Sequence, residues 1–120
     1  MQKGQWQTIT VVRGLILEVL LDCRPSSATF GEVEAFEFSA DDAMQIILPP
    51  GIAHGYEVPS DEVIIHYGST VEYFPKQEVT INTESAVLSK VWKIPDPIMS
   101  NRDKEALDWS IIKEKIEFDL

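Results

Sequence analysis

The sequence predicts an all-β jelly roll with one short C-terminal helix, and three observations lead to this fold class. Short β-rich runs recur roughly every 8 to 12 residues, turn residues separate them, and only the last third departs from this pattern. A hydrophobic content of 44% supplies enough apolar side chains for a core. At 120 residues, the length fits a single domain over residues 1–120.

The predicted strands lie in the first two thirds of the chain. They cover residues 8–12, 15–22, 33–38, 44–48, 54–58, 63–67, 70–73 and 79–81. Proline, glycine, serine and aspartate stand between the runs and favour turns. Residues 15–21 are apolar at every position except Glu18, so we expect Glu18 to lie on a largely buried strand. A buried carboxyl group needs a partner or a function.

The last third predicts an extended linker followed by a helix. Residues 94–97, Ile-Pro-Asp-Pro, favour an extended segment because each proline disfavours helix in the residue before it. Ser100 and Asp103 form a capping-box pattern, which by itself explains an aspartate at this position. Apolar residues then recur at helical spacing: Leu107, Trp109, Ile111, Ile112 and Ile116. We expect one helix that packs on the sheet.

The charge of the chain excludes two classes of partner. Twenty acidic and ten basic side chains give a formal net charge of -10, which repels nucleic acid and an anionic membrane surface. No run approaches the roughly 18 apolar residues of a membrane span, and the first residues lack an apolar signal region. The single cysteine, Cys23, allows no internal disulfide. We therefore expect a cytoplasmic protein in which Cys23 is a small core residue.

We expect neither a metal nor a cofactor. Metal sites in jelly rolls usually need several histidines together with a carboxylate. This chain has two histidines, His54 and His66, and a site built from both of them and Glu18 is the alternative. The sequence contains no glycine-rich phosphate loop and no nucleophile elbow.

Three side chains are candidates for proton chemistry in a cavity. His54 follows a Pro-Gly turn and stands between two small residues that allow close approach of a ligand; alternatively, its ring binds the turn backbone. Tyr67 ends an apolar run and Tyr73 precedes Phe-Pro, although each is also typical of a core edge with a wet hydroxyl. Since neighbouring residues on a strand point to opposite faces, His66 should face away from Tyr67.

Several segments together match one known family in order and spacing. They are residues 11–14 (Val-Val-Arg-Gly), 18–24 (Glu-Val-Leu-Leu-Asp-Cys-Arg), 27–31 (Ser-Ala-Thr-Phe-Gly), 38–40 (Phe-Ser-Ala), 48–55 (Leu-Pro-Pro-Gly-Ile-Ala-His-Gly) and 98–103 (Ile-Met-Ser-Asn-Arg-Asp). On these segments, residues 8–103 resemble the dTDP-4-dehydrorhamnose 3,5-epimerase family. Its members are dimers with the cupin-type double-stranded β-helix, a jelly roll.

The resemblance implies roles for eight residues. Members of the family abstract a proton next to the ketone of a nucleotide-linked sugar and return a proton to the other face. The catalytic positions match His54, Tyr67, Tyr73 and Asp103. The substrate-binding positions match Gln7, Glu18, Glu78 and Arg102.

Within this set, the resemblance makes Tyr67 the acid, His54 the second pocket histidine and Asp103 the aspartate of the base dyad. The base histidine of the family lies in an Arg-Gly-Leu-His stretch upstream of the first matching strand. This chain begins after that stretch, so Asp103 would lack a dyad partner within the chain. Gln7 replaces the lysine that holds the oxyanion, and its amide donates a hydrogen bond without carrying charge.

We therefore expect a diverged epimerase of deoxysugar or polysaccharide synthesis that acts on a nucleotide-linked keto sugar as a homodimer. If active, it is a metal-independent isomerase with intact or altered epimerisation. In that case His54, oriented by Glu18, or Tyr73 takes over the work of the base. The alternative is a non-catalytic sugar-nucleotide-binding or regulatory cupin that keeps the pocket without the base.

Overall fold

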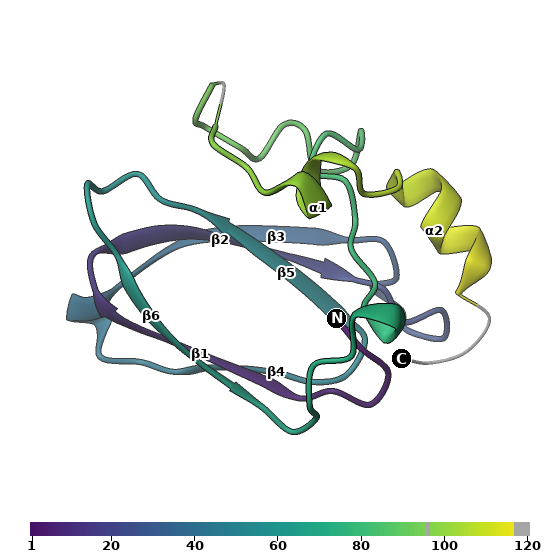
Figure 1. The fold of residues 1–120 in the computed structure, drawn as a ribbon, viewed down its shortest axis with the longest axis horizontal. Helices are drawn as coiled ribbons and strands as arrows, with labels where there is room; N and C mark the ends of the chain where they lie inside the picture. The colour runs from purple at the N-terminus through teal and green to yellow at the C-terminus, as the bar shows by residue number, and fades with distance from the viewer. Residues whose placement is uncertain (96, 117–120) are drawn as a thin grey trace.

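The computed structural model describes residues 1–95 and 97–116, which fold into two layers of antiparallel sheet (Figure 1). The first sheet has the order β4-β1-β6 and comprises β1 (Gln7–Arg13), β4 (Ile46–Leu48) and β6 (Ile64–Ser69). The second has the order β3-β2-β5 and comprises β2 (Leu15–Asp22), β3 (Val33–Ser39) and β5 (Ile52–Glu57). Six of the predicted runs thus coincide with strands to within two residues at either end. The all-β prediction is confirmed.

Within residues 1–95 and 97–116, the helices are few and short. They are the 3₁₀ helices η1 (Ala40–Asp42) and η2 (Pro75–Gln77) and the α-helices α1 (Asn101–Lys104) and α2 (Trp109–Lys115). The segment that carries α1 and α2 lies over the β3-β2-β5 sheet (Figure 1). In the described part of the chain, no helix has the length and apolar character needed to cross a membrane.

Strand β2 is covered on both faces, which explains its nearly continuous apolar run. One face carries Ile16 and Leu20 into the core between the two sheets. The other face carries Leu17 and Val19, which pack against Leu88 of the C-terminal segment. A strand covered on both faces needs apolar residues at successive positions rather than an alternating pattern.

Helix α2 packs on the outer face of the β3-β2-β5 sheet, at one end of β2. Its Trp109 and Ile112 are buried in a cluster that also contains Leu21 and Cys23. Cys23 is fully buried, as predicted, and burial raises the pKa of its thiol to about 12. The thiol is therefore protonated at neutral pH and packs as a small apolar group.

The prediction of a strand at residues 70–73 is wrong. Strand β6 ends at Ser69, whose hydroxyl accepts a hydrogen bond from the N–H of Val71 and donates one to the Val71 carbonyl. These bonds hold a local turn that directs the chain away from the sheet. Tyr73 therefore lies in irregular structure before η2.

The prediction of a strand at residues 79–81 is also wrong. The N–H of Val79 donates to the carbonyl of Met1, and the Met1 amine donates to the carbonyl of Val79. Ile81 forms only an isolated bridge with Leu107. The backbone groups of residues 79–81 pair with single residues from different parts of the chain and not with one neighbouring strand, so no strand forms here.

One continuous C-terminal helix is likewise not observed. Ser100 caps α1 by accepting a hydrogen bond from the N–H of Asp103, as the capping pattern predicts. The backbone and side chain of Asn82 then donate to carbonyls of residues 106–107. Asp108 begins α2 by accepting from the N–H two residues further on. A tertiary contact thus holds the turn that divides the predicted helix.

The turn between β1 and β2 depends on Gly14, and we expect Gly14→Ala to lower the free energy of unfolding by about 3 kcal/mol. Gly14 has φ +90°, and an added Cβ would lie 2.3 Å from the carbonyl oxygen of Glu62. Gly31→Ala is the matched control, since Gly31 has φ +83° with open space around it and should lose about 1 kcal/mol. Urea unfolding measures both, and equal losses would contradict the role of the close contact.

Candidate functional site

Strands β2 and β5 bring three polar side chains to the inner face of their sheet. In their antiparallel register, Glu18 stands opposite Tyr56 and Leu20 stands opposite His54. Paired residues on neighbouring strands point to the same side. Because Leu20 packs in the core between the sheets, Glu18, His54 and Tyr56 also face the inside of the barrel.

Glu18 and His54 form a buried pair. The Glu18 side chain is 0% exposed, and its Oε1 lies 2.9 Å from Nδ1 of His54, which is 13% exposed. Burial raises the pKa of the Glu18 carboxyl, against the opposing effects of the hydrogen bond and charge of His54. Since Nδ1 is occupied, Nε2 is the ring nitrogen left for a ligand. The expected partner of the buried carboxyl is therefore His54.

Tyr67 approaches this pair from the opposite sheet. The register of β1 with β6 pairs Tyr67 with Ile9, a core residue, so Tyr67 faces inward. Its ring centroid lies 6.2 Å from that of His54 and 6.5 Å from that of Tyr56. Tyr67 is 48% exposed, and the partial burial of its phenol raises the phenol pKa above its usual range, with Tyr56 and Glu18 adding to this effect. The phenol is protonated throughout the neutral range, as a proton donor must be.

Gln7 belongs to the same interior. It lies two residues before Ile9 on β1 and is therefore on the same inner face. Its partner on β6 is Ser69, which makes Gln7 and Tyr67 diagonal neighbours across the two strands. The fold thus brings together four of the eight predicted site residues: Gln7, Glu18, His54 and Tyr67.

The other four predicted residues form a second group near α1. Arg102 donates from Nη1 to the hydroxyl of Tyr73 over 3.2 Å, and its Nε lies 3.9 Å from Oδ1 of Asp103. The hydrogen bond with Tyr73 raises the pKa of Arg102. Glu78 accepts a hydrogen bond from the amine of Met1. Tyr73 and Arg102 are more than half exposed, so this group presents a guanidinium and a phenol to solvent.

His66 is not part of the interior site. It pairs with Thr10 on β1, one residue along from the inward-facing pair of Ile9 and Tyr67, and it is exposed on the outer face. The alternative metal site of both histidines with Glu18 is therefore not assembled. In residues 1–95 and 97–116, no group of three or more histidine, cysteine, aspartate or glutamate side chains is placed to hold a metal ion.

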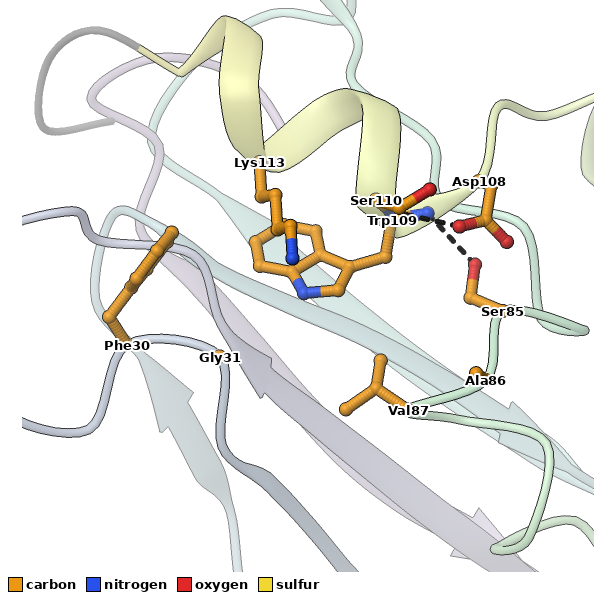
Figure 2. A pocket seen from close by; sticks show the side chains of 9 residues that line it. All are labelled: Phe30, Gly31, Ser85, Ala86, Val87, Asp108, Trp109, Ser110 and Lys113. Carbon is orange, nitrogen blue, oxygen red and sulfur yellow. Dashed lines mark hydrogen bonds between the residues drawn. The ribbon is translucent and has the colours of Figure 1, made fainter.

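A surface hollow of about 400 Å³ lies apart from these groups, between the loop at Phe30 and the start of α2 (Figure 2). Trp109 lines it, with its ring centroid 5.7 Å from that of Phe30. The backbone N–H of Trp109 donates to the hydroxyl of Ser85 over 2.9 Å. Lys113 of α2 also lines the hollow. None of the eight predicted site residues lines it, so the candidate site is the interior of the barrel.

Comparison with known proteins identifies the family of the chain. The family model described as dTDP-4-dehydrorhamnose 3,5-epimerase matches residues 1–110. The chain belongs to the dTDP-4-dehydrorhamnose 3,5-epimerase family. The recognition made on sequence segments is confirmed, as is the cupin-type jelly roll, because the solved structures that resemble the chain are epimerases of this family.

Three relatives illustrate the similarity. The dTDP-4-dehydrorhamnose 3,5-epimerase of Methanothermobacter thermautotrophicus is 30% identical over 94% of this chain and 61% of its own length. The crystal structure of the enzyme from Elizabethkingia anophelis matches with a TM-score of 0.85 and 31% identity, covering 92% of this chain and 63% of that one. A 3'-monoepimerase from Streptomyces bikiniensis, in complex with dTDP-quinovose, matches with a TM-score of 0.84 and 27% identity, covering 95% and 59%. The chain spans about a third to three fifths of the length of the curated epimerases it matches.

For this member of the epimerase family, we expect Glu18→Gln to gain stability relative to the wild type as the pH rises. Below the ordinary pKa of 4.5 the carboxyl is protonated in both the folded and the unfolded chain. Above this pH, the carboxyl ionises in the unfolded chain before it ionises in the folded chain. The free energy of unfolding of the wild type therefore falls until the pH passes the raised pKa of the folded state, by about 1.4 kcal/mol for each unit by which the pKa is raised.

Urea unfolding of both proteins between pH 4 and pH 8 measures this difference. Glu37→Gln, at an exposed position of β3, controls for the loss of one negative charge. A difference between Glu18→Gln and the wild type that is constant with pH would contradict the effect of burial on Glu18.

Proposed function

We propose that the chain epimerises a dTDP-linked 4-keto-6-deoxy sugar at C3, C5 or both, in deoxysugar or polysaccharide synthesis. The observation that carries the proposal is the inward-facing group of Glu18, His54 and Tyr67 in a member of this epimerase family. The complex of the Streptomyces bikiniensis monoepimerase with dTDP-quinovose supports the choice of ligand. A cytoplasmic setting belongs to the proposal, because the single cysteine of these 120 residues allows no disulfide among them.

The proposed reaction moves two protons at one carbon. A base takes a proton from the carbon next to the ketone, and the electrons of the broken C–H bond form an enolate. Tyr67 then gives its phenolic proton to the other face of that carbon, and the ketone re-forms with inverted configuration. His54 is the proposed base through Nε2, since Glu18 holds Nδ1. Tyr73, the other base candidate from the sequence, lies with Arg102 outside the interior group. Gln7 is the proposed donor to the enolate oxygen.

The second group is the proposed site for the nucleotide diphosphate. A guanidinium presents several N–H donors in a geometry that suits phosphate oxygens, and Arg102 is more than half exposed. In a chain of net charge -10, a phosphorylated ligand needs such a local cation. Tyr73, Glu78 and Asp103 surround Arg102 and complete the proposed subsite.

Incubation with dTDP-4-keto-6-deoxyglucose in D₂O tests the proposed reaction, with deuterium uptake at C3 and C5 followed by NMR. We expect uptake at one or both carbons together with formation of the epimer. No uptake combined with a thermal shift on adding dTDP would support the second candidate, a non-catalytic binding cupin. Absence of both signals would contradict the assignment of a nucleotide sugar.

Tyr67→Phe tests the proposed acid. Removal of its hydroxyl should lower the rate of net epimerisation by about 10² to 10⁴, because the second proton transfer loses its donor. The thermal shift with dTDP should stay unchanged, since the nucleotide is assigned to the group around Arg102. Epimerisation at the wild-type rate would rule out Tyr67 as the acid.

We further propose that the chain forms a homodimer through the outer face of the β4-β1-β6 sheet. The residues at strand positions on this face include Thr8, Thr10, Ile47, Ile64 and His66. Ile47 is 60% exposed and Ile64 is 46% exposed, and none of the five residues is an acid. For a chain of net charge -10, strand positions without carboxylates allow two copies to approach with less repulsion.

Ile47→Lys should therefore shift the chain toward the monomer, as measured by sedimentation velocity. Ile98→Lys is the matched control, because Ile98 is fully exposed and lies outside this sheet. An unchanged sedimentation coefficient for Ile47→Lys, with the wild type a dimer, would place the interface elsewhere.

A further inference from the structure

Tyr56 is an inward-facing phenol that takes no part in the proposed reaction. It lies two residues after His54 on β5, so both side chains face the inside of the barrel. Its direct partner across β2 is Glu18, the carboxyl that binds His54. Tyr56 is 39% exposed, so part of its side chain is open to solvent.

Tyr67 lies close to two inward-facing residues of β5, His54 and Tyr56. Its ring centroid is 6.2 Å from that of His54 and 6.5 Å from that of Tyr56, with interplanar angles of 50° and 37°. Tyr67 comes from one sheet, while His54 and Tyr56 come from the other. The two phenols therefore meet between the two layers.

The proximity of Tyr56 affects the pKa of Tyr67. After burial, the nearby side chain of Tyr56 is the largest cause that raises the pKa of Tyr67. The charge of Glu18 acts in the same direction, because a negative group nearby disfavours a second negative group. Three features of the interior thus keep Tyr67 in its neutral form.

We propose that Tyr56 is a positioning residue, which pairs with the hydroxyl of Tyr67 and holds this phenol in place beside His54. Tyr56 itself transfers no proton to the sugar in this scheme. Its part in catalysis rests on the proposed epimerase function, whereas the pairing of the two phenols does not. The competing explanation is that Tyr56 is a rim residue whose hydroxyl is solvated and does not affect Tyr67.

The chain has three tyrosines, so labelling them with ¹³C at Cζ gives three NMR signals that Tyr→Phe variants assign. We expect Tyr56→Phe to shift the Tyr67 signal and to lower the pH at which Tyr67 titrates. Tyr73→Phe is the matched control, since Tyr73 binds Arg102, and it should leave the Tyr67 signal in place. An unmoved signal and titration of Tyr67 in Tyr56→Phe would overturn the pairing.

The activity of Tyr56→Phe provides the second measurement. If Tyr56 acts through Tyr67, kcat for epimerisation should fall about 10-fold with KM changed by less than about 2-fold, because only the placement of the acid is lost. A wild-type kcat in Tyr56→Phe would overturn the positioning role. If the wild-type chain is itself inactive on dTDP-linked keto sugars, the proposed function fails, and the NMR result alone decides whether Tyr56 positions Tyr67.

Discussion

The contact between Glu18 and His54 is the interaction on which the interior site depends, because it makes a fully buried carboxyl group tolerable in the middle of β2. A buried polar group without a partner costs about 1 to 3 kcal/mol, which is a large part of the stability of a small domain. The hydrogen bond with Nδ1 of His54 offsets this cost for one oxygen of Glu18. The second oxygen has no hydrogen-bond partner within the described part of the chain. The same contact sets the orientation of the imidazole ring.

The burial of Glu18 is in turn a consequence of how the layers are stacked. The inner face of β2 packs on the other sheet, and its outer face is covered by the C-terminal segment through residues such as Leu88. Side chains far from the site therefore help to keep water from the carboxyl group. The stacking also brings Tyr67 of one sheet to His54 and Tyr56 of the other, so the acid-base group exists only between the layers.

Much of this arrangement follows from local sequence patterns. The period of two in a strand predicts that His66 faces away from Tyr67, and the apolar run around Glu18 predicts its burial; both are observed. The same period, counted on from His54, indicates that Tyr56 faces the interior. The pattern fails at residues 70–73 and 79–81, where hydrogen bonds of Ser69 and Met1 replace a ladder. A run that looks like a strand forms one only when another strand is available to pair with it.

By itself, the sequence determined the fold class, the position of six strands, the membership in the epimerase family and the need of Glu18 for a partner. These features depend on composition, on short-range periodicity and on motifs that can be read along the chain. The expectation that Glu18 orients His54 came from the family resemblance, and the structure shows that the contact uses Nδ1. Only the tertiary structure decided that Asn82 divides the predicted helix and that Tyr56 meets Tyr67. Each of these contacts joins segments that lie far apart in the sequence, and strand register and layer packing set which side chains meet.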